Sequence, residues 1–181
     1  MNQASVTLHG VFMEVLRLGV LLSGASGVGK SELALELLNR GHRLIADDAP
    51  EFFCSEAGRV RGRCPEALRD FLEVRGLGVI DIRAMFGAAV MVPEAELQLV
   101  LHLEAMSSAR LAAVDRLRPS RDICTVLGVE VPRITLPVAP GRNLAILAET
   151  AVRSHRLSLT GRDMAAEFAL RQQERLSRGD A

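Results

Sequence analysis

The sequence predicts an α/β fold in which a mixed β-sheet surrounds a central helix that follows a phosphate-binding loop. Residues 24–31 (GASGVGKS) fit the pattern G-x-x-x-x-G-K-[ST]. The apolar run 19–23 directly before them indicates a buried strand, and Leu33, Leu37 and Leu38 after them share one face of a helix. A glycine-rich turn between a strand and a helix lets backbone N–H groups close on phosphate oxygens at the positive end of the helix.

The other elements continue this alternation of short strands with few helices. We expect strands at 6–12 with a break at His9–Gly10, and at 19–23, 43–46, 51–54, 60–63, 79–82, 97–103 and 133–138. We expect helices at 30–40, ended by Gly41, at 65–71, and, over about 143–178, two C-terminal helices that run from 143 through 152 and from 162 to 178. Asn143 is the expected N-cap of the first C-terminal helix. Pro132 and Pro137 restrict the strand 133–138 to an edge or a strand end, because proline cannot donate to a ladder.

Length and composition indicate one domain, residues 1–181, with an aliphatic core. Hydrophobic residues make up 49% and charged residues 24% of the chain, which is ordinary for a globular protein. The net charge is zero and the chain has no Trp or Tyr, so we expect no nucleic-acid partner. Glu14 and Arg17 interrupt the apolar stretch 11–22, which excludes a signal peptide or a membrane span. With three cysteines in no metal-like spacing, we expect a cytoplasmic protein with reduced thiols and no membrane partner.

The loop carries the most specific chemistry in the chain. Its eight residues, expected to bind ATP, are Gly24, Ala25, Ser26, Gly27, Val28, Gly29, Lys30 and Ser31. In loops of this kind the lysine, here Lys30, reaches the β- and γ-phosphates, and the hydroxyl of Ser31 ligates Mg²⁺. The structural context of a strand before and a helix after makes an accidental match improbable.

Further candidates are less specific when each is taken alone. Asp47 and Asp48 follow a hydrophobic strand, where one carboxylate can hold metal and the other can accept a hydroxyl proton, but the pair also suits an ordinary turn. The segment 73–81 places an acid and a base before two glycines, which suits either a ligand loop or a generic turn. His9 before glycine is by itself more often a turn residue than a catalyst, and spacing does not single out Arg116 or Arg142.

Taken in order, these segments resemble the catalytic domain of the HPr kinase/phosphorylase family over nearly the whole chain. The segments that carry the resemblance are 9–11 (HGV), 24–32, 40–48 (RGHRLIADD), 73–80 (EVRGLGVI), 86–87, 115–117 (DRL) and 140–144 (PGRNL). The second and third long segments, 40–48 and 73–80, are far more specific than the phosphate loop. The resemblance is to the short form, without the separate N-terminal domain of many members.

The resemblance implies a P-loop kinase core similar to phosphoenolpyruvate carboxykinase, and a bifunctional enzyme. Such an enzyme phosphorylates a serine of the phosphocarrier protein HPr with ATP and Mg²⁺, and removes the phosphate by phosphorolysis, which yields pyrophosphate. It thereby regulates the phosphotransferase system and carbon metabolism. The active-site positions match His9, Lys30, Asp48 and Arg116, with Asp47 adjoining, and the magnesium positions match Ser31 and Glu73. The segment 137–142, which includes Arg142, matches a loop used mainly in phosphorolysis. The family also implies a homo-oligomer, often a hexamer.

Two other function classes remain open from the sequence. A small-molecule kinase or a carboxykinase-like enzyme on a similar core would phosphorylate a metabolite without any protein acceptor. A nucleotide-sensing module would bind ATP and a partner but transfer nothing. The intact set of Lys30, Ser31, Asp47, Asp48 and Glu73 argues against the sensing module, which has no chemical need for all five.

Overall fold

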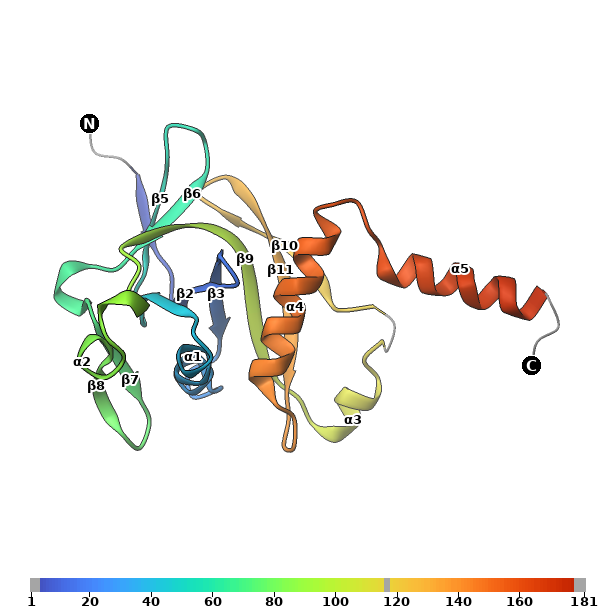
Figure 1. The fold of residues 1–181 in the computed structure, drawn as a ribbon, viewed down its shortest axis with the longest axis horizontal. Helices are drawn as coiled ribbons and strands as arrows, with labels where there is room; N and C mark the ends of the chain where they lie inside the picture. Colours follow the sequence, from blue (N-terminus) through green and yellow to red (C-terminus); the bar gives the residue numbers. More distant parts are fainter. Residues whose placement is uncertain (1–3, 116–117, 178–181) are drawn as a thin grey trace.

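The computed structural model describes residues 4–115 and 118–177 and shows a mixed α/β fold (Figure 1). The strands are β1 (Ser5–Thr7), β2 (Val11–Val15), β3 (Leu18–Gly24), β4 (Arg43–Ala46), β5 (Glu51–Cys54), β6 (Val60–Arg63), β7 (Phe71–Val74), β8 (Gly78–Asp81), β9 (Glu94–Ala105), β10 (Arg121–Val126) and β11 (Val129–Val138). The helices are α1 (Lys30–Asn39), α2 (Ile82–Phe86), α3 (Ser108–Ala112), α4 (Leu144–Ser158) and α5 (Met164–Ser177), with 3₁₀ turns at Glu66–Leu68 and Ala88–Val90.

Nine strands of the described chain form one mixed sheet, and β7 pairs with β8 alone. Strand β2 is antiparallel to both β3 and β4, and β9 is parallel to both β3 and β11. Strands β4, β3, β9 and β11 therefore run in one direction, and their carboxyl ends meet at the same edge of the sheet. The start of β2 lies at that edge too. The segments that follow or precede these strand ends build the site described below.

The two faces of the sheet carry separate cores because successive side chains of a strand point to opposite faces. Helices α1 and α4 lie on one face (Figure 1), where alternate strand residues such as Val20 and Leu22 meet Leu33 and Leu37 of α1 and Ala148 of α4. On the other face Phe12 and Phe52 pack edge to face with ring centroids 5.0 Å apart. Helix α5 extends away from the body in Figure 1 and buries none of its described residues.

Most expected elements are present, including the break at His9–Gly10 between β1 and β2. The helix from Lys30 ends at Asn39, and Gly41 follows in the left-handed region with φ 87°. Asn143 caps α4, because its side chain accepts a hydrogen bond from the N–H of Ile146. The strand expected at 97–103 is the middle of the longer β9.

Of the two positions expected for 133–138, an edge or a strand end, the edge was wrong, and the segment forms the C-terminal end of β11. Strand β11 pairs with β10 on one side and β9 on the other. Pro132 lies where only β10 is paired and Pro137 where only β9 is paired, so neither proline lies where both neighbours are paired. The expected helix 65–71 was also wrong in extent, because it is a single 3₁₀ turn and β7 begins at Phe71.

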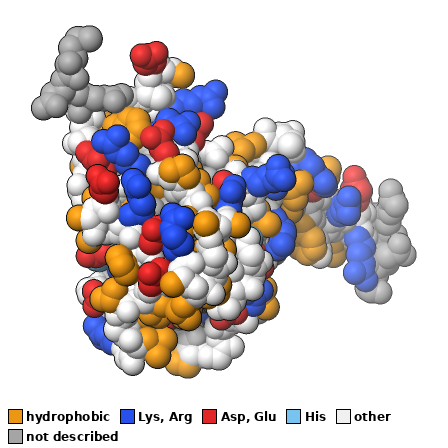
Figure 2. Space-filling model, turned by 60° about the vertical axis from the view of Figure 1, so that its left-hand side comes forward, with side chains coloured by type: hydrophobic (Ala, Val, Ile, Leu, Met, Phe, Trp, Pro, Cys, Tyr) orange, Lys and Arg blue, Asp and Glu red, His pale blue; other side chains and the backbone are white. Residues whose placement is uncertain are grey.

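Figure 2 shows basic and acidic side chains interspersed over the face that it presents. This pattern agrees with the net charge of zero. In the described residues, no helix is both long enough and apolar enough to cross a membrane.

Candidate functional site

The loop 24–31 turns from the end of β3 into α1 through backbone conformations that glycine favours. Gly24 has φ 141°, and a Cβ there would lie 2.5 Å from the carbonyl oxygen of Leu103 in β9. Any side chain at this position would therefore collide with the neighbouring strand. Gly29, the N-cap of α1, has φ 104°, a left-handed conformation. The turn consequently leaves its backbone close to whatever occupies the N-terminus of α1.

The side chain of Lys30 is held against this loop by two backbone carbonyl groups of the loop. Its Nζ donates to the carbonyl oxygens of Gly24 and Ala25, each at 3.1 Å. The residue is only 8% exposed, so its ammonium group is a buried cation. A charged donor in this position can turn from the carbonyl oxygens to the oxygens of a bound phosphate, a stronger acceptor.

The loop forms one wall of a cleft of about 370 Å³. The residues that line the cleft are His9, Ser26, Gly27, Gly29, Lys30, Ser31, Glu32, Asp47, Asp48, Glu73 and Arg75. They come from four parts of the chain: the turn before β2, the loop and first turn of α1, the end of β4, and the β7–β8 hairpin. Three of these parts meet there because they adjoin strand ends at the same edge of the sheet.

Asp47 is the buried member of the acidic pair, with 9% of its surface exposed. Its Oδ2 accepts a hydrogen bond from the backbone N–H of Glu73 at 2.8 Å. Burial raises the pKa of the Asp47 carboxyl above its usual range, and the nearby charges of Asp48 and Glu73 act in the same direction, while the Glu73 N–H opposes the shift. Asp47 therefore faces protein more than solvent.

Asp48 differs from its neighbour in both backbone and surroundings. Its φ is +62°, a left-handed conformation that Asp tolerates better than most residues. The side chain is 68% exposed, and its Oδ1 lies 2.9 Å from Nδ1 of His9. This carboxylate is open to a reactant, and the imidazole restricts its orientation.

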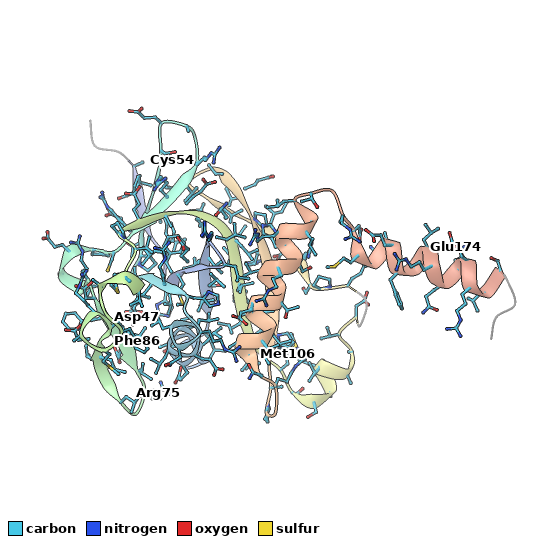
Figure 3. The ribbon with its side chains drawn as sticks, viewed as in Figure 1. Asp47, Cys54, Arg75, Phe86, Met106 and Glu174 are labelled. Carbon is cyan, nitrogen blue, oxygen red and sulfur yellow. The ribbon has the colours of Figure 1, made fainter. Side chains whose placement is uncertain are left out.

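The β7–β8 hairpin contributes Glu73 and Arg75, and Figure 3 shows Asp47 and Arg75 on the side of the molecule where this hairpin lies. Segment 73–81 is thus mostly a hairpin, with Glu73 paired to Val79. The Arg75 guanidinium lies against the loop, since a Cβ added at Gly27 would be 3.2 Å from Nη1 of Arg75. The hairpin therefore brings both an acid and a base to the loop.

Some expected site residues lie elsewhere. Arg142 lines a second groove of about 760 Å³ together with Arg110 and Pro137. Arg116 lies outside the described residues. Val28 packs against the core rather than lining the cleft.

The sequence motifs assign no role to Glu32, and they mark Arg75 only as the base of the segment 73–81. Position could have marked Glu32, because it lies in the first turn of α1, where a carboxylate is near the loop. For Arg75 the signal was its place directly before the turn that Gly76 and Gly78 indicate, two residues after Glu73.

The cleft offers oxygen donors rather than a preformed metal cage. Among the residues that the structure describes, no group of three or more His, Cys, Asp and Glu side chains could hold a metal ion. The Ser31 hydroxyl and the Glu73 carboxylate line the same cleft. Such a small oxygen set suits Mg²⁺, which keeps several waters and shares its remaining positions with substrate phosphates.

Comparisons with known proteins identify the family of the chain. Residues 2–172 match the family model described as the HPr Serine kinase C-terminal domain. The chain is 52% identical over 174 residues to the HPr kinase/phosphorylase of Xanthomonas campestris pv. campestris, covering 96% of this chain and 55% of that protein. It is 49% identical over 164 residues to the HPr kinase/phosphorylase of Chromobacterium violaceum, covering 91% of this chain and 52% of that protein. The chain therefore spans about half the length of these curated relatives.

A solved structure gives the same result for the fold. The structure of the Hpr(Ser) kinase/phosphatase from Coxiella burnetii matches with a TM-score of 0.79 and 36% sequence identity. The match covers 90% of this chain and 98% of the Coxiella chain. Sequence and structure agree that this chain belongs to the HPr serine kinase C-terminal domain family.

Proposed function

We propose that this chain phosphorylates a serine of the phosphocarrier protein HPr with ATP, and catalyses the reverse phosphorolysis of serine-phosphorylated HPr. The observation that carries the proposal is that one cleft is lined by the exposed Asp48 carboxylate and by the buried Lys30 ammonium. The cleft thus contains both a proton acceptor and a cation that can stabilise a phosphoryl group. The names of the relatives, HPr kinase/phosphorylase, supply the protein acceptor.

The loop and α1 are proposed to act as a P-loop kinase core of the phosphoenolpyruvate carboxykinase type. Backbone N–H groups of 24–31 and the N-terminus of α1 would bind the phosphates of ATP. The Lys30 ammonium would leave the carbonyl oxygens of Gly24 and Ala25 for the β- and γ-phosphates. Arg75, which lies against Gly27, adds a second cation to this side of the cleft.

Ser31 and Glu73 would hold Mg²⁺, because their oxygens line the cleft beside the loop. The bound ion would neutralise the charge that develops on the phosphate oxygens.

Asp48 is proposed to move the proton in both directions. In the forward reaction it takes the proton of the serine hydroxyl, the serine oxygen bonds to the γ-phosphorus, and the bond from that phosphorus to ADP breaks. In the reverse reaction an oxygen of inorganic phosphate attacks the phosphorus of phosphoserine, and the leaving serine oxygen takes the proton from Asp48. Pyrophosphate is the second product. His9 fixes the carboxylate through the 2.9 Å contact.

Arg116 and Arg142 are proposed as further cations of the reaction, Arg142 chiefly for phosphorolysis. We also propose that the protein is cytoplasmic and forms a homo-oligomer, with a hexamer as the expected size. Light scattering after gel filtration measures the size directly, and a monomeric mass at working concentration would contradict the oligomer.

The function is tested by incubating the chain with ATP, Mg²⁺ and the HPr of the same organism, followed by mass spectrometry of the products. We expect one phosphate on one serine of HPr, and none with the Asp48→Asn variant. Adding inorganic phosphate to the phosphorylated HPr should release pyrophosphate. A protein that phosphorylates a small metabolite but never HPr would be a metabolite kinase, and one that binds ATP without any transfer would be a sensor.

A further inference from the structure

The two adjacent carboxylates of the cleft have different surroundings in the structure. Asp48 is 68% exposed and faces His9, whereas Asp47 is 9% exposed. The Oδ2 of Asp47 accepts a hydrogen bond from a backbone group, the N–H of Glu73, at 2.8 Å. Asp47 and Glu73 are 26 positions apart in the sequence, so this hydrogen bond joins two separate parts of the fold.

The hairpin that contains Glu73 lies outside the main sheet. Strands β7 and β8 pair only with each other. A two-stranded ribbon leaves backbone groups unpaired along its outer edges, and such a ribbon is marginal without support. Leu72 and Val74 supply apolar support by burial in the core on the α1 side. The Asp47 carboxylate supplies polar support by accepting from the outward N–H of Glu73.

The hydrogen bond between Asp47 and the N–H of Glu73 lies close to two side chains that line the cleft. Glu73 lies in β7, and Arg75 is the first residue of the turn that follows this strand, so both belong to the hairpin. Both line the cleft, and the Arg75 guanidinium lies against Gly27 of the loop. A displacement of the β7 edge would therefore move the candidate magnesium ligand and the second cation together.

We propose that Asp47 is a positioning residue that holds the β7–β8 hairpin in register with the loop 24–31. Asp47 acts through the backbone of Glu73, and Asp48 alone among the pair meets the reactants. The catalytic consequence rests on the proposed kinase function, but the hydrogen bond and its effect on the hairpin do not.

The test compares Asp47→Ala and Asp47→Asn in the full chain by amide hydrogen exchange without nucleotide. Alanine removes the acceptor, whereas asparagine keeps an acceptor oxygen and removes the charge. We expect Asp47→Ala to raise the exchange rate of the Glu73 amide at least tenfold and to raise exchange of the following turn. We expect Asp47→Asn to keep most of the protection. Asp48→Ala is the matched control and should leave exchange in the hairpin unchanged.

Kinetics supply the second measurement. We expect Asp47→Ala to raise the Mg²⁺ concentration for half-maximal rate several-fold, and Asp47→Asn to recover most of the wild-type rate. Unchanged exchange at Glu73 in a folded Asp47→Ala protein would overturn the proposal. So would an Asp47→Asn variant with full hairpin protection and a rate as low as that of Asp48→Asn, because Asp47 would then act directly on the reactants. If the wild type transfers no phosphate to HPr, the kinase proposal fails while the exchange test still stands.

Discussion

The imidazole of His9 and the carboxylate of Asp48 face each other at 2.9 Å in the cleft beside the loop 24–31. The residue after His9 is bonded to Asp48 as well, because the N–H of Gly10 donates to the carbonyl oxygen of Asp48 at 3.3 Å. The start of β2 and the end of β4 are neighbours in the sheet, and this pairing brings the two residues together. The orientation of Asp48 is thus determined by two strands at once.

This geometry predicts that Asp48→Asn abolishes transfer in both directions. An amide of the same shape cannot accept the serine proton, and general-base catalysis contributes about 10²–10⁴-fold. ATP affinity should remain, because the phosphates bind elsewhere in the cleft. Rates of HPr phosphorylation and pyrophosphate release, together with nucleotide binding by calorimetry, measure all three quantities.

His9→Gln is the companion variant and should lower both rates by less than Asp48→Asn, since His9 orients the carboxylate. An active Asp48→Asn protein beside an inactive Asp47→Asn protein would reverse the roles of the two carboxylates.

Lys30→Met should lower phosphoryl transfer by several orders of magnitude. The variant removes the ammonium charge that would stabilise the β- and γ-phosphates, and it keeps the apolar stem of the side chain. The fold should survive at a cost of about 1 kcal/mol in the free energy of unfolding, from the lost hydrogen bonds to Gly24 and Ala25. Single-turnover kinetics and a urea titration check the two effects. Near-normal turnover in the folded variant would contradict the phosphate-loop assignment.

Arg142→Ala should reduce phosphorolysis more than the kinase reaction. Phosphorolysis brings two anionic groups together and so demands more cationic donors than attack by a neutral hydroxyl. Leu136 of β11 lies two strand spacings, or roughly 10 Å, from Gly24 across the sheet, and the segment 139–142 follows β11 at this edge. Arg142 is the single basic residue of the segment 137–142, since position 139 is an alanine, so we expect the wild type to show measurable but weak phosphorolysis.

Arg110→Ala provides the control for Arg142, because Arg110 lines the same groove but pairs with Glu104 at 2.7 Å. This variant should leave the ratio of reverse to forward rate unchanged. Equal losses in both directions for Arg142→Ala would identify Arg142 as a general site residue.

His155 makes the stability of the protein depend on pH. Burial lowers the pKa of the His155 imidazole below its ordinary value of 6.5, and the charge of Arg121 acts in the same direction. Below pH 6.5 the His155 imidazole therefore binds a proton more readily in the unfolded chain than in the folded chain. The free energy of unfolding consequently falls as the pH falls. We expect His155→Gln to remove this contribution, as measured by urea midpoints on both sides of pH 6.5.

Arg121→Gln tests the assigned cause. Removing the neighbouring charge should lessen the shift in the pKa of His155 and weaken the loss of stability on acidification. A full pH dependence in His155→Gln would place its origin in another group.

The sequence by itself determined the elements whose signals are local. The apolar spacing of Leu33, Leu37 and Leu38 predicted a helix, and all three are buried in α1. Asn143 predicted a helix start and caps α4. Helical periodicity and capping act within a few residues, so they can be predicted without knowledge of the fold.

Strand β10 shows where local signals failed. Its exposed, mixed residues gave no clear alternation, and only the last, Val126, is buried. The turn to β11 places Leu127 at φ 50° and Gly128 at φ 80°, a two-residue hairpin connection that usually carries Asn or Asp before glycine. Pairing with β11 decided this strand, and pairing is a property of the sheet.

The site divides in the same way. Sequence order and family resemblance predicted that Lys30, Asp48 and Glu73 serve one site, and the cleft contains all three. Only the tertiary structure decided that Asp47 is buried and bonded to the N–H of Glu73 while Asp48 is exposed beside His9. Two successive aspartates are chemically equal in a sequence. They differ in the folded protein because the backbone after β4 directs the Asp47 carboxylate toward the β7–β8 hairpin and the Asp48 carboxylate toward solvent.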